Sequence, residues 1–328
     1  MAYVQVVAGL VLLVFAGDFM VRGAVSLAQR AGISTLVIGL TVVAFGTSAP
    51  ELVVGIDAVL KDAPTLALGN VVGSNIANVL LVVGLSALIA PVSCDAPRLG
   101  RNLMIMLVAT ALFIGLAHSG TIGWKEGIVL LAFLCLFLVY SGMRSKTMSC
   151  DLEPTEHTEH TDGFQDKPDG YALAGALVVG GLIGLAIGAD LLVTGAVDIA
   201  RNFGVSEAVI GLTLVALGTS LPELVTAIVA AVRGHCDVAV GNVIGSNLFN
   251  LLGIMGITSL VGPIPVPESF LRIDLWVMLA STMLLIPFCR LRSQVGKFSG
   301  IAMVSMYVGY IVYLAHSHSS AAVMGLEL

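Results

Sequence analysis

Long apolar runs recur from one end of this 328-residue chain to the other, and most are long enough to cross a lipid bilayer. Hydrophobic residues make up 57% of the chain and charged residues only 11%, a composition typical of membrane proteins. Inside a bilayer the backbone has to satisfy its own hydrogen bonds, so each run is expected to be a helix. We predict an all-α polytopic membrane protein with ten transmembrane helices, at residues 3–27, 33–60, 64–90, 102–118, 123–142, 171–200, 205–232, 237–261, 271–289 and 299–315.

Basic residues indicate how these spans are oriented. Segments on the cytoplasmic side of a membrane carry an excess of Lys and Arg. With the N-terminus outside, eleven of the 15 basic residues face the cytoplasm, and the exceptions are Lys61, Lys125, Arg201 and Arg272. We therefore expect both termini on the outer side.

The chain also contains an internal duplication. Residues 17–84 align without a gap on residues 189–256, at a constant offset of 172, and about half of the aligned positions are identical. Five predicted spans separate each position from its partner, and an odd number reverses the direction of the chain across the membrane. We predict two inverted five-helix repeats, at 1–143 and 171–328. Inverted repeats with interrupted helices at matching positions are typical of secondary transporters.

An acidic segment at 144–170 joins the two repeats. Segments rich in charge and poor in apolar residues do not order themselves. We interpret this segment as a solvated cytoplasmic linker, and weak metal sensing by its Glu156-His157-Thr158-Glu159-His160 run is the alternative.

Each repeat carries one polar hexapeptide inside an apolar span, Gly46-Thr47-Ser48-Ala49-Pro50-Glu51 and Gly218-Thr219-Ser220-Leu221-Pro222-Glu223. A glutamate at membrane depth is costly, which marks it as a functional candidate. The proline lacks an N–H and crowds the preceding turn, so the carbonyl groups just before it are freed. Carboxylate and carbonyl oxygens together form the kind of site that hard cations such as Ca²⁺ and Na⁺ require.

The following span of each repeat carries a second polar motif, at 69–78 and 241–250. Ser74 and Asn78 are four residues apart and share one helix face, and the same holds for Ser246 and Asn250. Their hydroxyl and amide oxygens are expected to face the glutamates. The alternative is that these positions only pack and hydrogen-bond between helices. Glycines within both motifs are expected to permit close approach of a neighbouring helix, namely Gly69, Gly73, Gly241 and Gly245.

Other membrane acids have simpler explanations. Asp18 and Asp190 occupy matching repeat positions, which suggests hydrogen bonding between helices or a gate rather than an aspartyl protease dyad. Asp57 matches Val229, and we interpret it as an aspartate near the outer mouth. No nucleophile, base and orienting group recur together, so we do not expect an enzyme.

The doubled Gly-Thr-Ser-x-Pro-Glu and Gly-Ser-Asn-x-x-Asn motifs resemble the sodium/calcium exchanger family of the cation/calcium antiporter superfamily, in its short prokaryotic form. The two α-repeats of that family correspond to 39–84 and 211–256. The resemblance implies ten helices, ion sites between spans 2, 3, 7 and 8, and alternating access by sliding of spans 1 and 6. It also implies a prokaryotic plasma membrane location.

By motif position the resemblance assigns Ca²⁺ to Glu51, Glu223 and the backbone carbonyls of Thr47 and Thr219. Sodium would use these glutamates with the Ala44 and Ala216 carbonyls and the hydroxyls of Ser48, Ser220, Ser74 and Ser246. Asn78 and Asn250 would flank the centre. Relatives coupled to potassium have Asp in place of Asn250, so potassium coupling is not expected.

The expected function is electrogenic exchange of Ca²⁺ for Na⁺ across the bilayer, without a cofactor, nucleic acid or protein partner. Exchange of Ca²⁺ or another divalent cation for H⁺ on the same fold is the alternative. A cation channel and a structural or receptor protein are further alternatives, and the latter leaves both glutamates unexplained.

Overall fold

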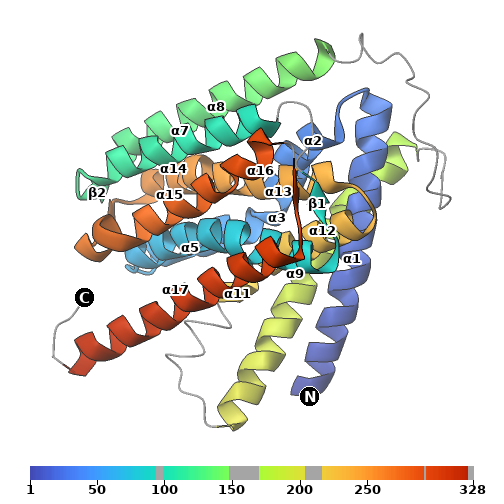
Figure 1. Ribbon diagram of the computed structural model, residues 1–328. Helices are drawn as coiled ribbons and strands as arrows, with labels where there is room; N and C mark the ends of the chain where they lie inside the picture. The colour runs from blue at the N-terminus through green and yellow to red at the C-terminus, as the bar shows by residue number, and fades with distance from the viewer. Residues whose placement is uncertain (94–98, 148–169, 204–215, 292, 324–328) are drawn as a thin grey trace.

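The computed structural model describes residues 1–93, 99–147, 170–203, 216–291 and 293–323, and almost all of them are helical (Figure 1). Short π-helical turns, labelled η, interrupt several of the helices. The first half contains α1 (Ala2–Ala31), α2 (Thr35–Ile38), η1 (Gly39–Val43), α3 (Ala44–Thr47), α4 (Ala49–Leu60), α5 (Pro64–Ala77), η2 (Asn78–Val83), α6 (Gly84–Ile89), α7 (Leu99–Ala117) and α8 (Trp124–Thr147). The second half contains α9 (Tyr171–Asn202), α11 (Ala216–Thr219), α12 (Leu221–Val232), α13 (Cys236–Leu248), η5 (Phe249–Ile254), α14 (Met255–Val261), η6 (Phe270–Asp274), α15 (Leu275–Leu284), α16 (Ile286–Arg290) and α17 (Lys297–Val323).

The predicted all-α membrane fold is confirmed. Eight described helices are long and apolar enough to span a membrane, and α2 to α4 form a ninth span that bends by 41°. The predicted span 205–232 is described from residue 216 onward, where α11 and α12 form its second part. Residues 148–169 of the predicted linker lie outside the described residues, so the linker and its metal-sensing alternative stay predictions.

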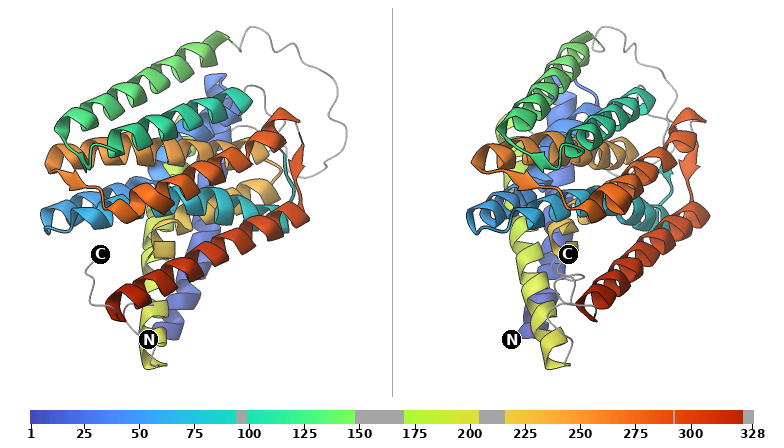
Figure 2. Two further views of the ribbon diagram at one scale, coloured as in Figure 1. Left: turned by 60° about the vertical axis from the view of Figure 1, so that its left-hand side comes forward. Right: turned by 90° about the vertical axis from the view of Figure 1, so that its left-hand side faces the viewer.

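Helices α1 and α9 lie side by side and run across the direction of the other long helices (Figures 1 and 2). They are antiparallel, because Gly9 lies against Leu192 whereas Gly23 lies against Ala174. Glycine allows this close approach, since a Cβ atom on Gly9 would lie 2.7 Å from the backbone nitrogen of Leu192. The first helix of each repeat therefore pairs with its inverted copy.

The remaining helices form a layered block around α5 and α13, which are the most buried spans. Gly241 and Gly245 permit the predicted close packing of α13, since Cβ atoms there would lie 2.8 Å from the Leu36 oxygen and 2.5 Å from the Leu40 oxygen. The matching neighbours of Gly69 and Gly73 fall mostly in 204–215, outside the described residues. Large apolar side chains cover the outside of the molecule, as expected for a surface in contact with lipid.

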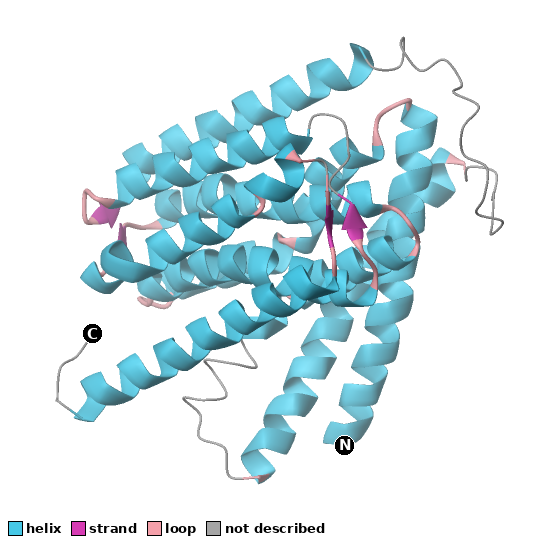
Figure 3. Cartoon of the chain, viewed as in Figure 1, coloured by secondary structure: helices cyan, strands magenta, loops and turns pink. Residues whose placement is uncertain are grey.

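Two short antiparallel strand pairs tie the halves together (Figure 3). Strand β1 (Val92–Ser93) pairs with β4 (Gln294–Val295), and β2 (Thr121–Ile122) pairs with β3 (Ile264–Pro265). The offset of 172 maps β1 onto β3, and it maps β2 onto β4 within one residue. The two ribbons are therefore symmetry mates, and they lie at opposite ends of the helical block. This arrangement is what inverted repeats predict.

The connection between α1 and α2 is unusually short. Gly32 ends α1 in the left-handed conformation, with φ of 62°, and only Ile33 and Ser34 follow before α2 begins. The Ser34 side chain caps α2 by accepting a hydrogen bond from the backbone N–H of Val37. Helix α1, which the family resemblance implies to slide, is thus joined to the broken span α2–α4 by a short connection.

Adjacent glycines of α9 provide a matched test of the α1–α9 contact. A Cβ atom on Gly181 would lie 2.6 Å from Met20 Cβ, whereas nothing lies within 4 Å of a Cβ on Gly180. We expect Gly181→Val to lower the thermal midpoint of the detergent-purified protein, because overpacking costs about 1–3 kcal/mol. Gly180→Val serves as the control with the same change in helix propensity. Equal midpoints for the two variants would contradict the packing described above.

Candidate cation-binding site

The predicted helix breaks are present at both hexapeptides. Helix α3 ends at Thr47, Ser48 has φ of −86° and ψ of 3°, and α4 begins with Pro50 in its first turn. Ser220 has nearly the same backbone angles, φ of −90° and ψ of 3°, before α12. Each glutamate therefore lies in the first turn of a new helix, where the helix dipole favours negative charge.

Both glutamates are completely buried, at 0% exposure. The Ser48 hydroxyl donates to Glu223 Oε1 at 3.0 Å, and the Ser246 hydroxyl donates to the same oxygen at 3.5 Å. Glu51 has no hydrogen-bond partner for either carboxylate oxygen within the described residues, and the same is true of Glu223 Oε2. The break in one repeat thus supports the carboxylate of the other repeat.

Neutral polar side chains of α5, η2, α13 and η5 are also buried. Asn250 is buried, and neither its amide oxygen nor its amide nitrogen has a partner in the described part of the chain. Asn78 donates to Asn247 Oδ1 at 3.1 Å, while its own oxygen has no described partner. The Ser220 hydroxyl donates to the Ser74 hydroxyl at 3.4 Å. Asn78 and Asn250 both lie in π-helical turns, which often occur at functional sites.

Hydrogen bonds join part of this buried cluster, since Glu223 accepts from Ser48 and Ser246, and the Ser246 hydroxyl lies 3.4 Å from the Thr47 hydroxyl. Ser220 binds Ser74, and Asn78 binds Asn247. Glu51 and Asn250 are buried and make no side-chain hydrogen bond among the described residues. Ala44 is also buried, and its carbonyl already accepts the Ser48 backbone N–H at 3.0 Å and the Thr47 hydroxyl at 3.3 Å. Thr219 is partly buried, and Ala216 begins α11 at the edge of the described residues. Their roles as ligands stay predictions.

Four asparagines of the repeated motif are part of the cluster, although sequence reasoning did not select them. The Thr47 hydroxyl donates to Asn242 Oδ1 at 3.1 Å, and the Thr219 hydroxyl donates to Asn70 Oδ1 at 3.3 Å. These two bonds are symmetry mates. Asn247 donates to the Asn75 carbonyl at 3.3 Å. Their presence in both copies of the second motif was a signal that could have identified them.

The other membrane acids lie away from this cluster. Asp18 forms an ion pair with Arg233 of the α12 terminus, which fits the predicted contact between helices. Asp57 is exposed and pairs with Lys61 at 2.7 Å, and its position near the outer mouth stays a prediction. Asp274, which sequence reasoning missed, is buried and accepts the Tyr310 hydroxyl at 2.8 Å, so it ties α17 to the start of α15.

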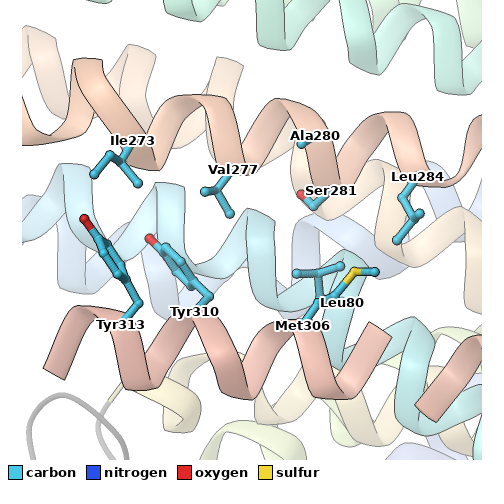
Figure 4. A pocket seen from close by; sticks show the side chains of 9 residues that line it. All are labelled: Leu80, Ile273, Val277, Ala280, Ser281, Leu284, Met306, Tyr310 and Tyr313. Atoms are coloured by element: carbon cyan, nitrogen blue, oxygen red, sulfur yellow. The ribbon is translucent and has the colours of Figure 1, made fainter. Parts of the chain in front are cut away.

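A separate cavity of about 630 Å³ lies between α15 and α17 (Figure 4). Its walls are mostly apolar side chains, including Val277, Leu284 and Met306, with Tyr310 and Tyr313 projecting toward Ile273. Only hydroxyl groups supply polar atoms there, because Ser281 and the tyrosines are its polar residues. This cavity lacks the charge that a cation would need.

The glutamate cluster has the chemistry of a site for a hard cation. It offers carboxylate, hydroxyl and amide oxygens, and the charges of the two carboxylates are close enough to interact. Within the described ranges no group of three or more His, Cys, Asp or Glu could hold a metal ion. A cation at this position would therefore depend on two carboxylates and on neutral oxygens.

Comparisons with known proteins identify the family of the chain. The profile of the family described as sodium/calcium exchanger protein matches residues 1–143 and 173–315. The putative antiporter CaxA of Alkalimonas amylolytica is 36% identical over 312 residues, which cover 94% of this chain and 97% of that protein. The sodium/calcium exchanger MaX1 of Methanosarcina acetivorans is 33% identical over 342 residues, which cover 93% of this chain and 96% of that protein.

A solved structure of the sodium-calcium exchanger NCX_Mj, soaked with Na⁺ and Sr²⁺, superposes with a TM-score of 0.80. It is 32% identical, and the match covers 95% of this chain and 97% of that one. The doubled motifs, the inverted repeats and these matches lead to one conclusion. The chain belongs to the sodium/calcium exchanger family.

Proposed function

We propose that this membrane protein is a secondary antiporter that exchanges Ca²⁺ for Na⁺ by alternating access. The observation that carries the proposal is the buried Glu51 carboxylate, which has no hydrogen-bond donor among the described residues although it lies fully inside the protein. An uncompensated carboxylate at this depth is costly, so a cation is the partner that the site requires. The similarity to MaX1 and NCX_Mj, which are both named as sodium/calcium exchangers, supports these two ions.

In the proposed cycle, Ca²⁺ is held by Glu51 and Glu223 together with the Thr47 and Thr219 carbonyls. Sodium uses the same carboxylates with the serine hydroxyls of both repeats and the Ala44 and Ala216 carbonyls. Ser48 and Ser246 now donate to Glu223, and a hydroxyl also carries lone pairs that can turn toward a cation. Asn78 and Asn250 contribute oxygen without adding charge. The two ions therefore compete for shared ligands, which couples their movements.

We propose that more than two Na⁺ ions exchange for one Ca²⁺, which makes the exchange electrogenic. Two carboxylates balance one Ca²⁺ or two Na⁺, so a third Na⁺ carries one net positive charge across the membrane. Moving one net charge contributes about 2.3 kcal/mol per 100 mV of membrane potential. The neutral Asn250 supports transport that does not depend on potassium.

The proposed location is the plasma membrane of a prokaryotic cell, with both termini outside and Ca²⁺ moved out of the cytoplasm. The bias of basic residues toward one side supports this orientation. Exchange of Ca²⁺ or another divalent cation for H⁺ is the second candidate, because a carboxylate without described donors can also accept a proton. A channel is less well supported, since a charge-balanced site between inverted broken helices does not form an open pore.

Glu51→Gln tests the central ligand. We expect Ca²⁺ uptake into Na⁺-loaded proteoliposomes to fall by about a hundredfold or more, the scale of removing one partner of a buried charge pair. Glu268→Gln is the control, because Glu268 is exposed and forms an ion pair with Arg272 at 2.6 Å. Uptake by Glu51→Gln within a few-fold of the control would refute the assignment.

The driving ion separates the two candidate functions. We expect an outward Na⁺ gradient to drive Ca²⁺ uptake at fixed pH, and a pH gradient alone to drive none. Equal potassium on both sides should leave the rate unchanged, whereas an inside-negative potential set by an ionophore should alter it. Uptake driven only by the pH gradient would assign the site to proton exchange.

Ser48→Ala tests the shared-ligand scheme. Loss of one hydroxyl ligand should raise the half-saturating Na⁺ concentration about two- to tenfold, with a smaller effect on Ca²⁺. Ser281→Ala is the matched control, because Ser281 is buried but donates to the Met278 carbonyl away from the site. If both ions weaken equally, the hydroxyl is not specific to Na⁺ and this part of the scheme is wrong.

A further inference from the structure

The ion pair between Asp18 and Arg233 joins the α1–α9 pair to one end of the block. Arg233 reaches the Asp18 carboxylate through two of its guanidinium nitrogens, and the Asp18 side chain is only 22% exposed. The contact continues at the neighbouring Gly17, where a Cβ atom would lie 2.9 Å from Val225. Helix α1 is thus closed against this end of α12.

The repeat provides a second, matching pair of charges. The offset of 172 maps Asp18 onto Asp190, and it maps Lys61 onto Arg233. The structure does not form this second pair. Lys61 instead binds Asp57 on its own helix at 2.7 Å, and Asp190 is exposed and makes no ion pair within the described part of the chain.

The two ends of the block also differ in how closely α1 and α9 pack against them. Val225, which contacts α1, is half-buried, whereas its counterpart Val53 on α4 is 66% exposed. Helix α1 packs along α12, and no comparable packing joins α9 to α4 in the described residues. Among the described residues, one end of the block is therefore closed by α1, and no helix closes the symmetric end, which we call the open end.

If each inverted repeat adopts the conformation of the other, the open and closed ends of the block are interchanged. We propose that Asp18–Arg233 and Asp190–Lys61 are alternative ion-pair locks, one for each face of the membrane, and that only one is closed at a time. This proposal rests on the proposed alternating-access function. Closing the second lock requires Lys61 to leave Asp57 and requires α1 to separate from Arg233.

Asp57 makes the two locks unequal. It holds Lys61 on the open side, whereas its counterpart Val229 cannot hold Arg233 in the same way. The competition weakens only the Asp190–Lys61 lock. Asp57 therefore favours the state that the structure shows, and removing its charge should favour the opposite state.

Cross-linking of cysteine pairs tests whether the locks exclude each other. In a background without the five native cysteines, we place cysteines at positions 18 and 233, at 61 and 190, or at all four. A short bifunctional thiosulfonate reagent is used, because Asp and Arg side chains span more than a disulfide does. Each pair should cross-link alone, and the four-cysteine protein should form only one cross-link per molecule. Both cross-links in one molecule, or none between 61 and 190, would overturn the proposal.

Thiol labelling tests the energetic role of the charges. A single cysteine from Val225→Cys reports the closed end, and one from Val53→Cys reports the open end. Asp18→Asn and Asp57→Val should each raise maleimide labelling at 225 about two- to fivefold, the range of a partly exposed ion pair, and lower it at 53. Lys61→Gln should shift labelling the opposite way. The charge exchange Asp18→Arg with Arg233→Asp should restore the original pattern.

Glu268→Gln, which breaks an exposed pair of the same type, should leave both labelling rates unchanged. Unchanged labelling in Asp18→Asn would show that the ion pair does not stabilise the closed end. These readouts need no particular ion. If Na⁺ drives no uptake but the two cross-links exclude each other, the proposed Na⁺/Ca²⁺ exchange is wrong and the two locks stand. If Na⁺ drives uptake but both cross-links form in one molecule, the proposed exchange stands and the two locks are wrong.

Discussion

The structure depends on the cost of keeping two carboxylates inside an apolar protein. Neither Glu51 nor Glu223 can be compensated by the alanine, valine and leucine side chains that fill the surrounding core. The first helix break brings the Ser48 hydroxyl to Glu223, and α13 supplies the Ser246 hydroxyl. These groups satisfy Glu223 in part and leave Glu51 without a donor in the described residues. The protein alone thus leaves carboxylate charge uncompensated, and a bound cation would compensate it.

The repeats supply equal groups, but the structure uses them unequally. Glu223 receives two serine hydroxyls, while the matching hydroxyl of Ser220 binds Ser74 instead of Glu51. The two glutamates thus differ in their hydrogen bonds, and the two ends of the block differ in exposure, since Val225 is half-buried and Val53 is exposed. Under the proposed alternating access the two repeats would exchange these roles, and the structure shows one of the two arrangements.

Much of this fold was predictable, because long apolar runs and a gapless duplication are strong local signals. The broken helices and the position of both glutamates followed from Pro50 and Pro222. Other features depend on tertiary contacts that spacing does not encode. The π-helical turns at Asn78 and Asn250, the paired strands, and the bond between Tyr310 and Asp274 are of this kind. Two equal motifs also cannot indicate which end is open.

The short connection after Gly32 limits how far α1 can move relative to α2. Four Cα steps join Ala31 to Thr35, and even a fully extended chain of that length reaches only about 13 Å. The separation of Ala31 and Thr35 therefore cannot exceed that length, and any larger displacement of α1 has to move α2 as well. Along the chain α2 is followed directly by η1 and Ala44, which lie just before the first helix break. In the proposed alternating-access cycle, a displacement of α1 would therefore be transmitted to the segment that carries the first hexapeptide.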